Sequence, residues 1–283
     1  MAHLLVFGPG YTATPVMERA QAEGWDVSAT YRTPEKKEDL EHKSIAAISF
    51  EDTEFKCPEN THLLITPAPK NGCPILKVWG SWVKQQKHVK SISYLSSTNV
   101  YGDHGGNWVD ETTPTTPSLK RGQSRLEAEE NWSNLADAVE ARIGLFRLAG
   151  IYGPNRNALM SLKTGKARRV IKEGQVFSRI HVADICEAIW AFMNDDTASG
   201  AFNLADDEPC APHLVIEEAA NMLGISPPPL EDFETAEMSE MARSFYMESK
   251  RVKNDKVKAL LGHGLHYPNY KVGLRELLKQ LPD

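Results

Sequence analysis

Near the start of the chain stands the stretch Leu4-Leu5-Val6-Phe7-Gly8-Pro9-Gly10-Tyr11-Thr12-Ala13. A short apolar run leads directly into a turn that matches G-x-G-x-x-G/A, with alanine in the third place. Gly8 permits the tight turn, Gly10 lets the backbone approach a pyrophosphate, and Ala13 is small enough for close packing of a helix on a strand. The helix that follows would offer its N-terminal N–H groups to phosphates. The stretch predicts a dinucleotide-binding turn; the alternative is a tight glycine turn that holds no ligand.

Apolar runs and helical patterns alternate through the first two thirds of the chain. The expected strands are Leu4–Phe7, Trp25–Tyr31, Ala46–Phe50, Leu63–Ile65, Ile92–Leu95 and Ile143–Leu148. This alternation is typical of an α/β fold with a Rossmann-type, doubly wound parallel sheet. After residue 206 the pattern becomes mostly helical, which predicts a smaller C-terminal lobe. We expect an NAD(P)-binding domain over residues 1–205, in which 153–178 contribute to the substrate lobe, and a C-terminal substrate lobe over residues 206–283.

Composition limits the class of protein. The net charge of −6 argues against a nucleic-acid partner, because such proteins are normally basic. No apolar run approaches the roughly 18 residues that a membrane span needs, and we expect no membrane partner. The four cysteines lie far apart, which favours free thiols in a reducing cytoplasm. The nine histidines show no ligand spacing, so no metal site is expected.

The residue after the second expected strand bears on the choice of cofactor. The acid that reads the ribose of NAD is absent there, and the strand ends with Tyr31, Arg32 and Thr33. Arg32 could pair with a 2′-phosphate, since a guanidinium binds phosphate through two hydrogen bonds. We therefore expect NADP in preference to NAD; an ordinary surface arginine is the alternative.

Hydroxyl groups gather in Tyr94-Leu95-Ser96-Ser97-Thr98-Asn99-Val100-Tyr101-Gly102, where a strand ends. Ligands of open α/β sheets bind at such strand ends. Three further segments share the pattern of one family: Phe146-Arg147-Leu148-Ala149-Gly150-Ile151-Tyr152-Gly153-Pro154, Ile180-His181-Val182-Ala183-Asp184, and Phe202-Asn203-Leu204 with Glu208-Pro209. Through these segments nearly the whole chain resembles the extended short-chain dehydrogenases/reductases, of the NAD-dependent epimerase/dehydratase-like type.

The resemblance implies roles for particular residues. Ser97 matches the active-site serine or threonine, whose hydroxyl holds a substrate oxygen during hydride or proton transfer. Hydroxyls that only satisfy backbone groups at a strand end are the alternative. Asp52 resembles the acid that contacts adenine. The remaining cofactor-binding positions implied are Gly8, Gly10, Tyr11, Thr12, Ala13, Arg32, Thr66, Pro67, Ala149 and Gly150, and the nearby substrate-binding positions are Thr98, Asn99 and Tyr101.

The family's catalytic Tyr-x-x-x-Lys pair is missing. The matching segment reads Arg121-Gly122-Gln123-Ser124-Arg125, so we place Arg121 and Arg125 in the candidate catalytic set with Ser97. Arg125 could hold a ribose hydroxyl. Arg121 cannot be a general acid or base near neutral pH, because a guanidinium does not release its proton. Three explanations remain open: another acid, dinucleotide binding without redox chemistry, or a different register. By position, the other candidate acids are Tyr101, Tyr152, His104 and His181.

Basic side chains concentrate between residues 155 and 183. They are Arg156, Lys163, Lys166, Arg168, Arg169, Lys172 and Arg179. The segment matches the part of the family that clamps substrates, so Arg156 and Arg179 are expected to bind an anionic substrate. A solvated basic face is the alternative, and Arg243 and Lys250-Arg251 could also contribute. Phe177 stands where the sugar epimerases carry a phosphate-binding arginine, which argues against a nucleotide sugar.

Two hypotheses about function follow. The first is a cytoplasmic NAD(P)-dependent oxidoreductase or epimerase with an atypical active site, acting on a small polar or anionic substrate, such as a nucleotide sugar. The second is a non-catalytic NAD(P)-binding sensor or regulatory protein that has lost the Tyr/Lys pair. A homodimer is expected for this fold class.

Overall fold

The computed structural model describes residues 1–70 and 72–281 and divides them into two compact units. The first comprises Met1–Val100, Leu119–Arg147 and Cys186–Phe202. The second comprises Tyr101–Ser118, Leu148–Ile185 and Asn203–Asp283, of which the last two residues lie outside the described part. The predicted functional division into a cofactor domain to residue 205 and a substrate lobe beyond it stays a prediction.

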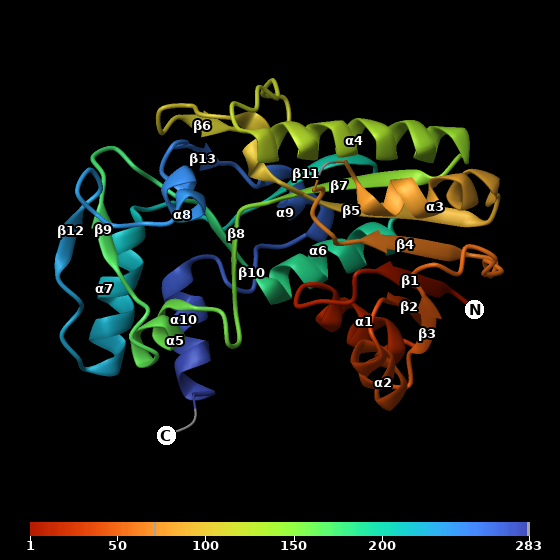
Figure 1. Ribbon diagram of the computed structural model, residues 1–283, viewed down its shortest axis with the longest axis horizontal. Helices are drawn as coiled ribbons and strands as arrows, with labels where there is room; N and C mark the ends of the chain where they lie inside the picture. The colour runs from red at the N-terminus through yellow and green to blue at the C-terminus, as the bar shows by residue number, and fades with distance from the viewer. Residues whose placement is uncertain (71, 282–283) are drawn as a thin grey trace. The chain divides into compact units, whose positions relative to one another are not determined.

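A seven-stranded sheet forms the centre of the first unit (Figure 1). Its order is β11 (Gly200–Leu204), β7 (Arg142–Leu148), β5 (Val89–Ser97), β4 (Thr61–Ile65), β1 (His3–Phe7), β2 (Asp26–Tyr31) and β3 (Ala46–Ser49). From β1 the chain runs outward to β3 and then crosses to β4 on the other side of β1, with parallel pairing on both sides. The predicted doubly wound parallel sheet is confirmed. Its topological switch point lies between β1 and β4, where folds of this type bind ligands beyond the carboxyl ends of the strands.

Helices cover both faces of this sheet. The helices that belong wholly or mostly to the first unit are α1 (Ala13–Ala22), α2 (Pro34–His42), α3 (Pro74–Gln85), α4 (Lys120–Ala138) and α6 (Val182–Asn194). In Figure 1, α3 and α4 lie on one face and α1 on the other. Helix α2 is not evident in the sequence, because its only buried residue is Leu40. It forms because Thr33 caps its first turn and Pro34 follows in the first helical position.

The core of the first unit is rich in aromatic rings. Trp79 on α3 is fully buried, and its indole Nε1 donates to the carbonyl of Phe50 at 2.8 Å. The ring of Trp79 meets those of Phe7 and Trp82 edge-on, at centroid distances of 5.1 Å in both cases. These contacts hold α3 against the sheet near the ends of β1 and β3.

The second unit is built from short elements around three two-stranded parallel ladders. Its strands are β6 (Trp108–Val109), β8 (Gly150–Tyr152), β9 (Arg169–Ile171), β10 (Arg179–His181), β12 (Leu230–Asp232) and β13 (Arg251–Val252). Its helices are α5 (Ala158–Lys163), α7 (Pro212–Leu223), α8 (Glu240–Phe245), α9 (Asp255–Leu261) and α10 (Tyr270–Lys279). The 3-10 turn η1 (Thr98–Tyr101) crosses from the first unit.

Two segments of this unit contain elements that their sequence does not indicate. Residues 103–118, rich in Gly, Pro, Thr and Asp, contain β6, which pairs with β13. The polar stretch over residues 155–172 contains all of α5 and β9. Strands of two or three residues show no readable periodicity, and their partners lie far away in sequence. Among the described residues, we find no helix that is both long and apolar enough to cross a bilayer.

The Trp79 contacts predict a large effect of its removal. Trp79→Ala should lower the free energy of unfolding by about 3–5 kcal/mol, since it empties a packed site and frees the Phe50 carbonyl. Trp108→Ala is the control, because this side chain is 51% exposed. It should change stability by less than about 0.5 kcal/mol. Chemical denaturation measures both, and equal losses in the two variants would contradict the packing described here.

Candidate functional site

The glycine turn packs against the end of β4. Gly8 has a φ of +80°, and a Cβ atom there would lie 2.6 Å from Pro67 Cγ and 2.8 Å from Thr66 Oγ1. Thr66 in turn donates its hydroxyl to the carbonyls of Phe7 and Gly8. Position 8 therefore requires glycine for two independent reasons, its backbone conformation and the lack of space. The turn is fixed at the switch point of the sheet.

The space beside the backbone of Gly10 is open instead. A Cβ at this position would meet only the carbonyl oxygen of Gly8, at 3.9 Å. The backbone folds tightly around it: Gly10 N donates to Gly8 O at 2.8 Å, and Ala13 N donates to Gly10 O at 3.0 Å. Thr12 is the N-cap of α1, and Ala13 is fully buried against the sheet. An exposed backbone beside a helix N-terminus fits the pyrophosphate of a dinucleotide.

Arg32, expected to select the cofactor, and Asp52, expected to contact adenine, follow neighbouring strands. Arg32 follows β2 directly, is exposed, and has its Cζ 3.9 Å from the ring centroid of Phe50. Asp52 lies beyond β3, is also exposed, and accepts a hydrogen bond from Glu54 N at 3.3 Å. Because β1, β2 and β3 are parallel, both residues lie at the same edge of the sheet as the glycine turn.

The hydroxyl cluster lies at the carboxyl end of β5. Ser97 is the last residue of this strand, is half-buried, and accepts a hydrogen bond on Oγ from Asn99 N at 3.3 Å. Thr98 and Asn99 begin η1 and are also half-buried. The hydroxyl of Ser97 keeps its own proton for donation, since this contact uses only a lone pair.

Helix α4 brings Arg125 to the same strand. Its Nη1 donates to the carbonyl of Leu95, two residues before Ser97, and its Cζ stands 6.0 Å from the ring centroid of Tyr94. Arg121 lies one helical turn earlier on α4 and is partly buried. Helical spacing puts Arg121 on the same face as Arg125, toward the N-terminal end of α4. The structure thus joins Arg125 to the strand of Ser97 through a direct hydrogen bond.

A buried ion pair that sequence reasoning missed lies one turn further along α4. Glu129 and Arg147 on β7 are joined at 2.8 Å, and their side chains are only 3% and 9% exposed. Ser96 donates its hydroxyl to the same carboxylate at 2.5 Å. A carboxylate that accepts from β5 and β7 together fixes α4 over both strands. It therefore sets where Arg125 stands relative to Ser97.

The other candidate acids belong to the second unit. Tyr101 is fully buried and donates its hydroxyl to Asn203 Oδ1 at 2.7 Å, and His104 Nε2 lies 3.1 Å from the carbonyl of Tyr101. Burial raises the pKa of Tyr152 far above its usual range, assisted by the charge of Asp206. Burial also lowers the pKa of His181 to about 4, so this imidazole is neutral at pH 7. Tyr152 and His181 therefore stay in one protonation state near neutrality.

Ala149 and Gly150, the residues expected beside the nicotinamide, form backbone hydrogen bonds. Ala149 N donates to Leu204 O at 3.0 Å, and Gly150 N donates to Ser178 O at 3.1 Å. Gly150 itself is exposed, and a Cβ there would lie 3.3 Å from Ser178 O. These hydrogen bonds hold the backbone of both residues in place, where β8 begins.

Much of the basic segment is paired within the second unit. Arg168 binds Glu231 and the carbonyl of Glu237, and Arg169 binds Glu217 at 2.7 Å. Arg179 donates to Phe177 O at 3.0 Å and contacts Cys210. Further, Lys172 donates to Tyr246 O, and Arg243 donates to two carbonyls. Arg156 and Lys166 are exposed.

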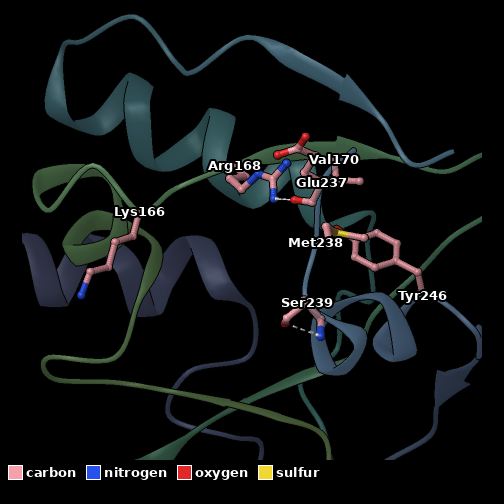
Figure 2. A pocket seen from close by; sticks show the side chains of 8 residues that line it. Lys166, Arg168, Val170, Glu237, Met238, Ser239 and Tyr246 are labelled. Atoms are coloured by element: carbon pink, nitrogen blue, oxygen red, sulfur yellow. Dashed lines mark hydrogen bonds between the residues drawn. The ribbon is translucent and has the colours of Figure 1, made fainter. Parts of the chain in front are cut away.

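A pocket of about 570 Å³ opens in this unit (Figure 2). It is lined by Lys166, Arg168, Val170, Glu237, Met238, Ser239, Ala242 and Tyr246. Apolar side chains share the wall with one lysine and one paired arginine. This mixture is typical of sites for small molecules with an apolar body and a charged group.

Two further polar groups are buried, and one of them includes Lys250, a residue of the basic set considered above for the substrate. Glu248 and Lys250 form an ion pair at 3.0 Å with side chains 3% and 9% exposed, and Ser118 donates its hydroxyl to Glu248. Asp206 is 1% exposed, and burial raises its pKa to about 7 against the opposing charge of Arg179. A polar residue in sequence gives no sign of burial, so neither could be found without coordinates. Among the described residues, no cluster of three potential metal ligands occurs.

Comparison with known proteins gives the family. A model of the NAD-dependent epimerase/dehydratase family matches residues 76–205. A conserved protein of unknown function from Silicibacter pomeroyi is 42% identical over the full length of both chains, with a TM-score of 0.90. The chain belongs to the NAD-dependent epimerase/dehydratase family. No curated protein matches it significantly.

More distant structures of this epimerase/dehydratase family share its fold. A human epimerase family protein solved with NADPH is 15% identical with a TM-score of 0.78, covering 99% of this chain and 100% of its own. The UDP-N-acetylglucosamine 4-epimerase from Bacillus cereus is 16% identical with a TM-score of 0.75 and full coverage of both chains. The dTDP-glucose 4,6-dehydratase from Bacillus anthracis, solved with NAD, is 16% identical with a TM-score of 0.74, covering 99% of this chain and 96% of its own. Family membership supports an NAD(P)-dependent function of the epimerase or short-chain dehydrogenase type with a nicotinamide cofactor.

The buried ion pair predicts a strong effect of neutralising Glu129. Glu129→Gln should lower the free energy of unfolding by about 3–5 kcal/mol, because Arg147 remains buried without its countercharge. Glu130→Gln is the matched control on the exposed side of α4 and should change it by less than about 0.5 kcal/mol. Denaturant titration compares them; two equal and small changes would contradict the anchoring role of Glu129.

The buried carboxyl of Asp206 predicts a pH dependence. Burial raises its pKa from 3.8, the ordinary value of an aspartate, to about 7, so between these limits the folded state retains a proton that the unfolded state releases. Its contribution to stability is therefore present at low pH and is lost as pH rises toward 7. In Asp206→Asn this dependence disappears. The stability of the wild type relative to the variant should fall by on the order of 1 kcal/mol per pH unit from pH 4.5 to 6.5. Denaturation curves at several pH values test this, and a constant difference would refute it.

Proposed function

We propose that the chain is an NADP-preferring oxidoreductase or epimerase of the extended short-chain dehydrogenase/reductase type with an atypical active site. One observation carries the proposal: the turn at Gly8 and Gly10 is locked at the switch point by Thr66 and Pro67, while its outer side stays open. A turn that only reversed the chain would need the close packing at Gly8. It would not need the open space around the backbone of Gly10.

The cofactor would lie along the carboxyl ends of the strands. We assign the pyrophosphate and neighbouring groups to Gly8, Gly10, Tyr11, Thr12, Ala13, Thr66 and Pro67. Asp52 would contact adenine, Arg32 a 2′-phosphate, and Ala149 and Gly150 the nicotinamide. The guanidinium of Arg32 favours NADP because its planar set of donors matches a phosphate. Among the structural neighbours, the human protein was solved with NADPH and the Bacillus anthracis dehydratase with NAD.

The chemistry would centre on Ser97. A bound nicotinamide supplies the hydride donor or acceptor. The Ser97 hydroxyl would donate to the reacting oxygen of the substrate and orient it. Arg125 uses one N–H group for Leu95 O, which leaves other donors for a ribose hydroxyl. Arg121 would supply positive charge but no proton.

We assign binding of a small polar or anionic substrate to Thr98, Asn99, Tyr101, Arg156 and Arg179. The pocket in Figure 2 is lined by none of these five residues; its volume suits a small molecule, and its wall carries Lys166, Arg168 and Glu237. Nucleotide sugars are one class to test, since the Bacillus cereus neighbour is a UDP-N-acetylglucosamine 4-epimerase. We further propose that the protein acts in the cytoplasm as a homodimer.

A second function, an NADP(H) sensor without turnover, is favoured by arginines at the positions of the catalytic Tyr and Lys. The two functions differ in one experiment, in which NADPH absorbance is followed with sugar nucleotides, aldehydes and ketones. Substrate-dependent loss of absorbance supports the enzyme. A melting temperature raised by NADPH without turnover of any compound supports the sensor.

Arg32 gives the sharpest test of the cofactor. Arg32→Ala should weaken NADP binding about 10- to 100-fold through the loss of charge-assisted hydrogen bonds, and change NAD binding less than about 2-fold. Lys43→Ala removes another exposed positive charge of the first unit and should leave both affinities unchanged. Calorimetric titration with each nucleotide provides the values. Equal weakening of NADP and NAD in Arg32→Ala would contradict the preference.

A further inference from the structure

The side chain of Arg32 is exposed, yet it rests on a buried aromatic ring. Its Cζ lies 3.9 Å from the ring centroid of Phe50, which is within the range of a close cation–π contact. Phe50 itself is only 6% exposed. One face of the guanidinium is therefore covered by protein, and the other face and the N–H edges remain toward solvent.

Both backbone groups of Phe50, its N–H and its carbonyl, form hydrogen bonds. Its N–H donates to Tyr31 O at 2.9 Å, which continues the pairing of β2 with β3. Its carbonyl accepts from Trp79 Nε1 at 2.8 Å, and Trp79 is fully buried. The ring is thus part of the rigid core, and its position is fixed relative to the residue that follows β2.

Stacking leaves the binding groups of Arg32 available. A guanidinium carries its five N–H donors in its plane, so contact through a face does not use them. No ion pair of Arg32 with a carboxylate occurs within residues 1–70 and 72–281. A stacked and uncompensated guanidinium matches a phosphate monoester, which takes two parallel N–H bonds.

We propose that Phe50 is a specificity-determining residue, which selects NADP by holding Arg32 in the orientation that binds the 2′-phosphate. The inference rests on the proposed function, since it presupposes that Arg32 reads that phosphate. Phe50 acts through Arg32 and touches no reacting atom. Without the ring, the arginine side chain must lose its rotational freedom upon binding, and the affinity for NADP falls.

The test compares Phe50→Leu, Arg32→Ala and the double variant by calorimetric titration with NADP⁺ and with NAD⁺. Phe50→Leu should weaken NADP⁺ binding about 2- to 5-fold, the ratio expected from an exposed cation–π contact, and leave NAD⁺ binding unchanged. The double variant should bind NADP⁺ no more weakly than Arg32→Ala, because Phe50 contributes only through the arginine. Phe55→Leu is the control, a half-buried aromatic residue beyond the same strand.

The outcomes separate this inference from the cofactor proposal. If Phe50→Leu leaves the NADP⁺ to NAD⁺ ratio unchanged while Arg32→Ala lowers it, the role of Phe50 is wrong and the NADP preference stands. If Phe50→Leu weakens both nucleotides equally, the ring is merely structural and the inference is also wrong. If Arg32→Ala itself leaves the ratio unchanged, the NADP preference fails. Phe50→Met, whose unbranched and flexible side chain adapts better to an irregular space, replaces Phe50→Leu if the latter does not fold.

Discussion

The close packing of Gly8 against the residues that follow β4 is the contact on which the rest of the site depends. Gly8 adopts a left-handed conformation and leaves no room for a Cβ beside Pro67 and Thr66. This contact joins the two strands that flank the switch point. It also fixes the direction in which α1 leaves the turn and the exposure of the backbone at Gly10. The cofactor site that we propose is built on that geometry.

A second constraint holds the opposite half of the first unit. The carboxylate of Glu129 ties α4 to Ser96 on β5 and to Arg147 on β7. Two charges removed from water are stable only when their hydrogen bonds are satisfied; here Nε and Nη2 of Arg147 donate to Glu129, and Ser96 donates to the same carboxylate. The same helix carries Arg121 and Arg125. Both arginines therefore stand on a rigid helix rather than in a loop.

The sequence was sufficient to predict those elements whose pattern lies within a short stretch of the chain. The strand, turn and helix around Gly8 follow each other within twenty residues, and the apolar strands could be located from their composition. It failed for α2, which buries a single leucine, and for the two- and three-residue strands of the second unit, whose partners are distant in the chain. In the candidate site, Ser97, Arg121 and Arg125 were predicted from the family pattern, and their roles stay predictions. Glu129 was not recognised as an anchor, because its partner Arg147 becomes a neighbour only through the fold.

The central claim is that the open backbone at Gly10 holds the linked phosphates of a pyridine dinucleotide. Calorimetric titration of the full chain with NADPH, alongside the variant Gly10→Ala, tests it most directly. The account predicts saturable binding of one equivalent to the wild type and markedly weaker binding to Gly10→Ala, with the melting temperature of the free variant little changed. No heat of binding with NADPH or NADH, or equal affinities in the two proteins, would contradict it.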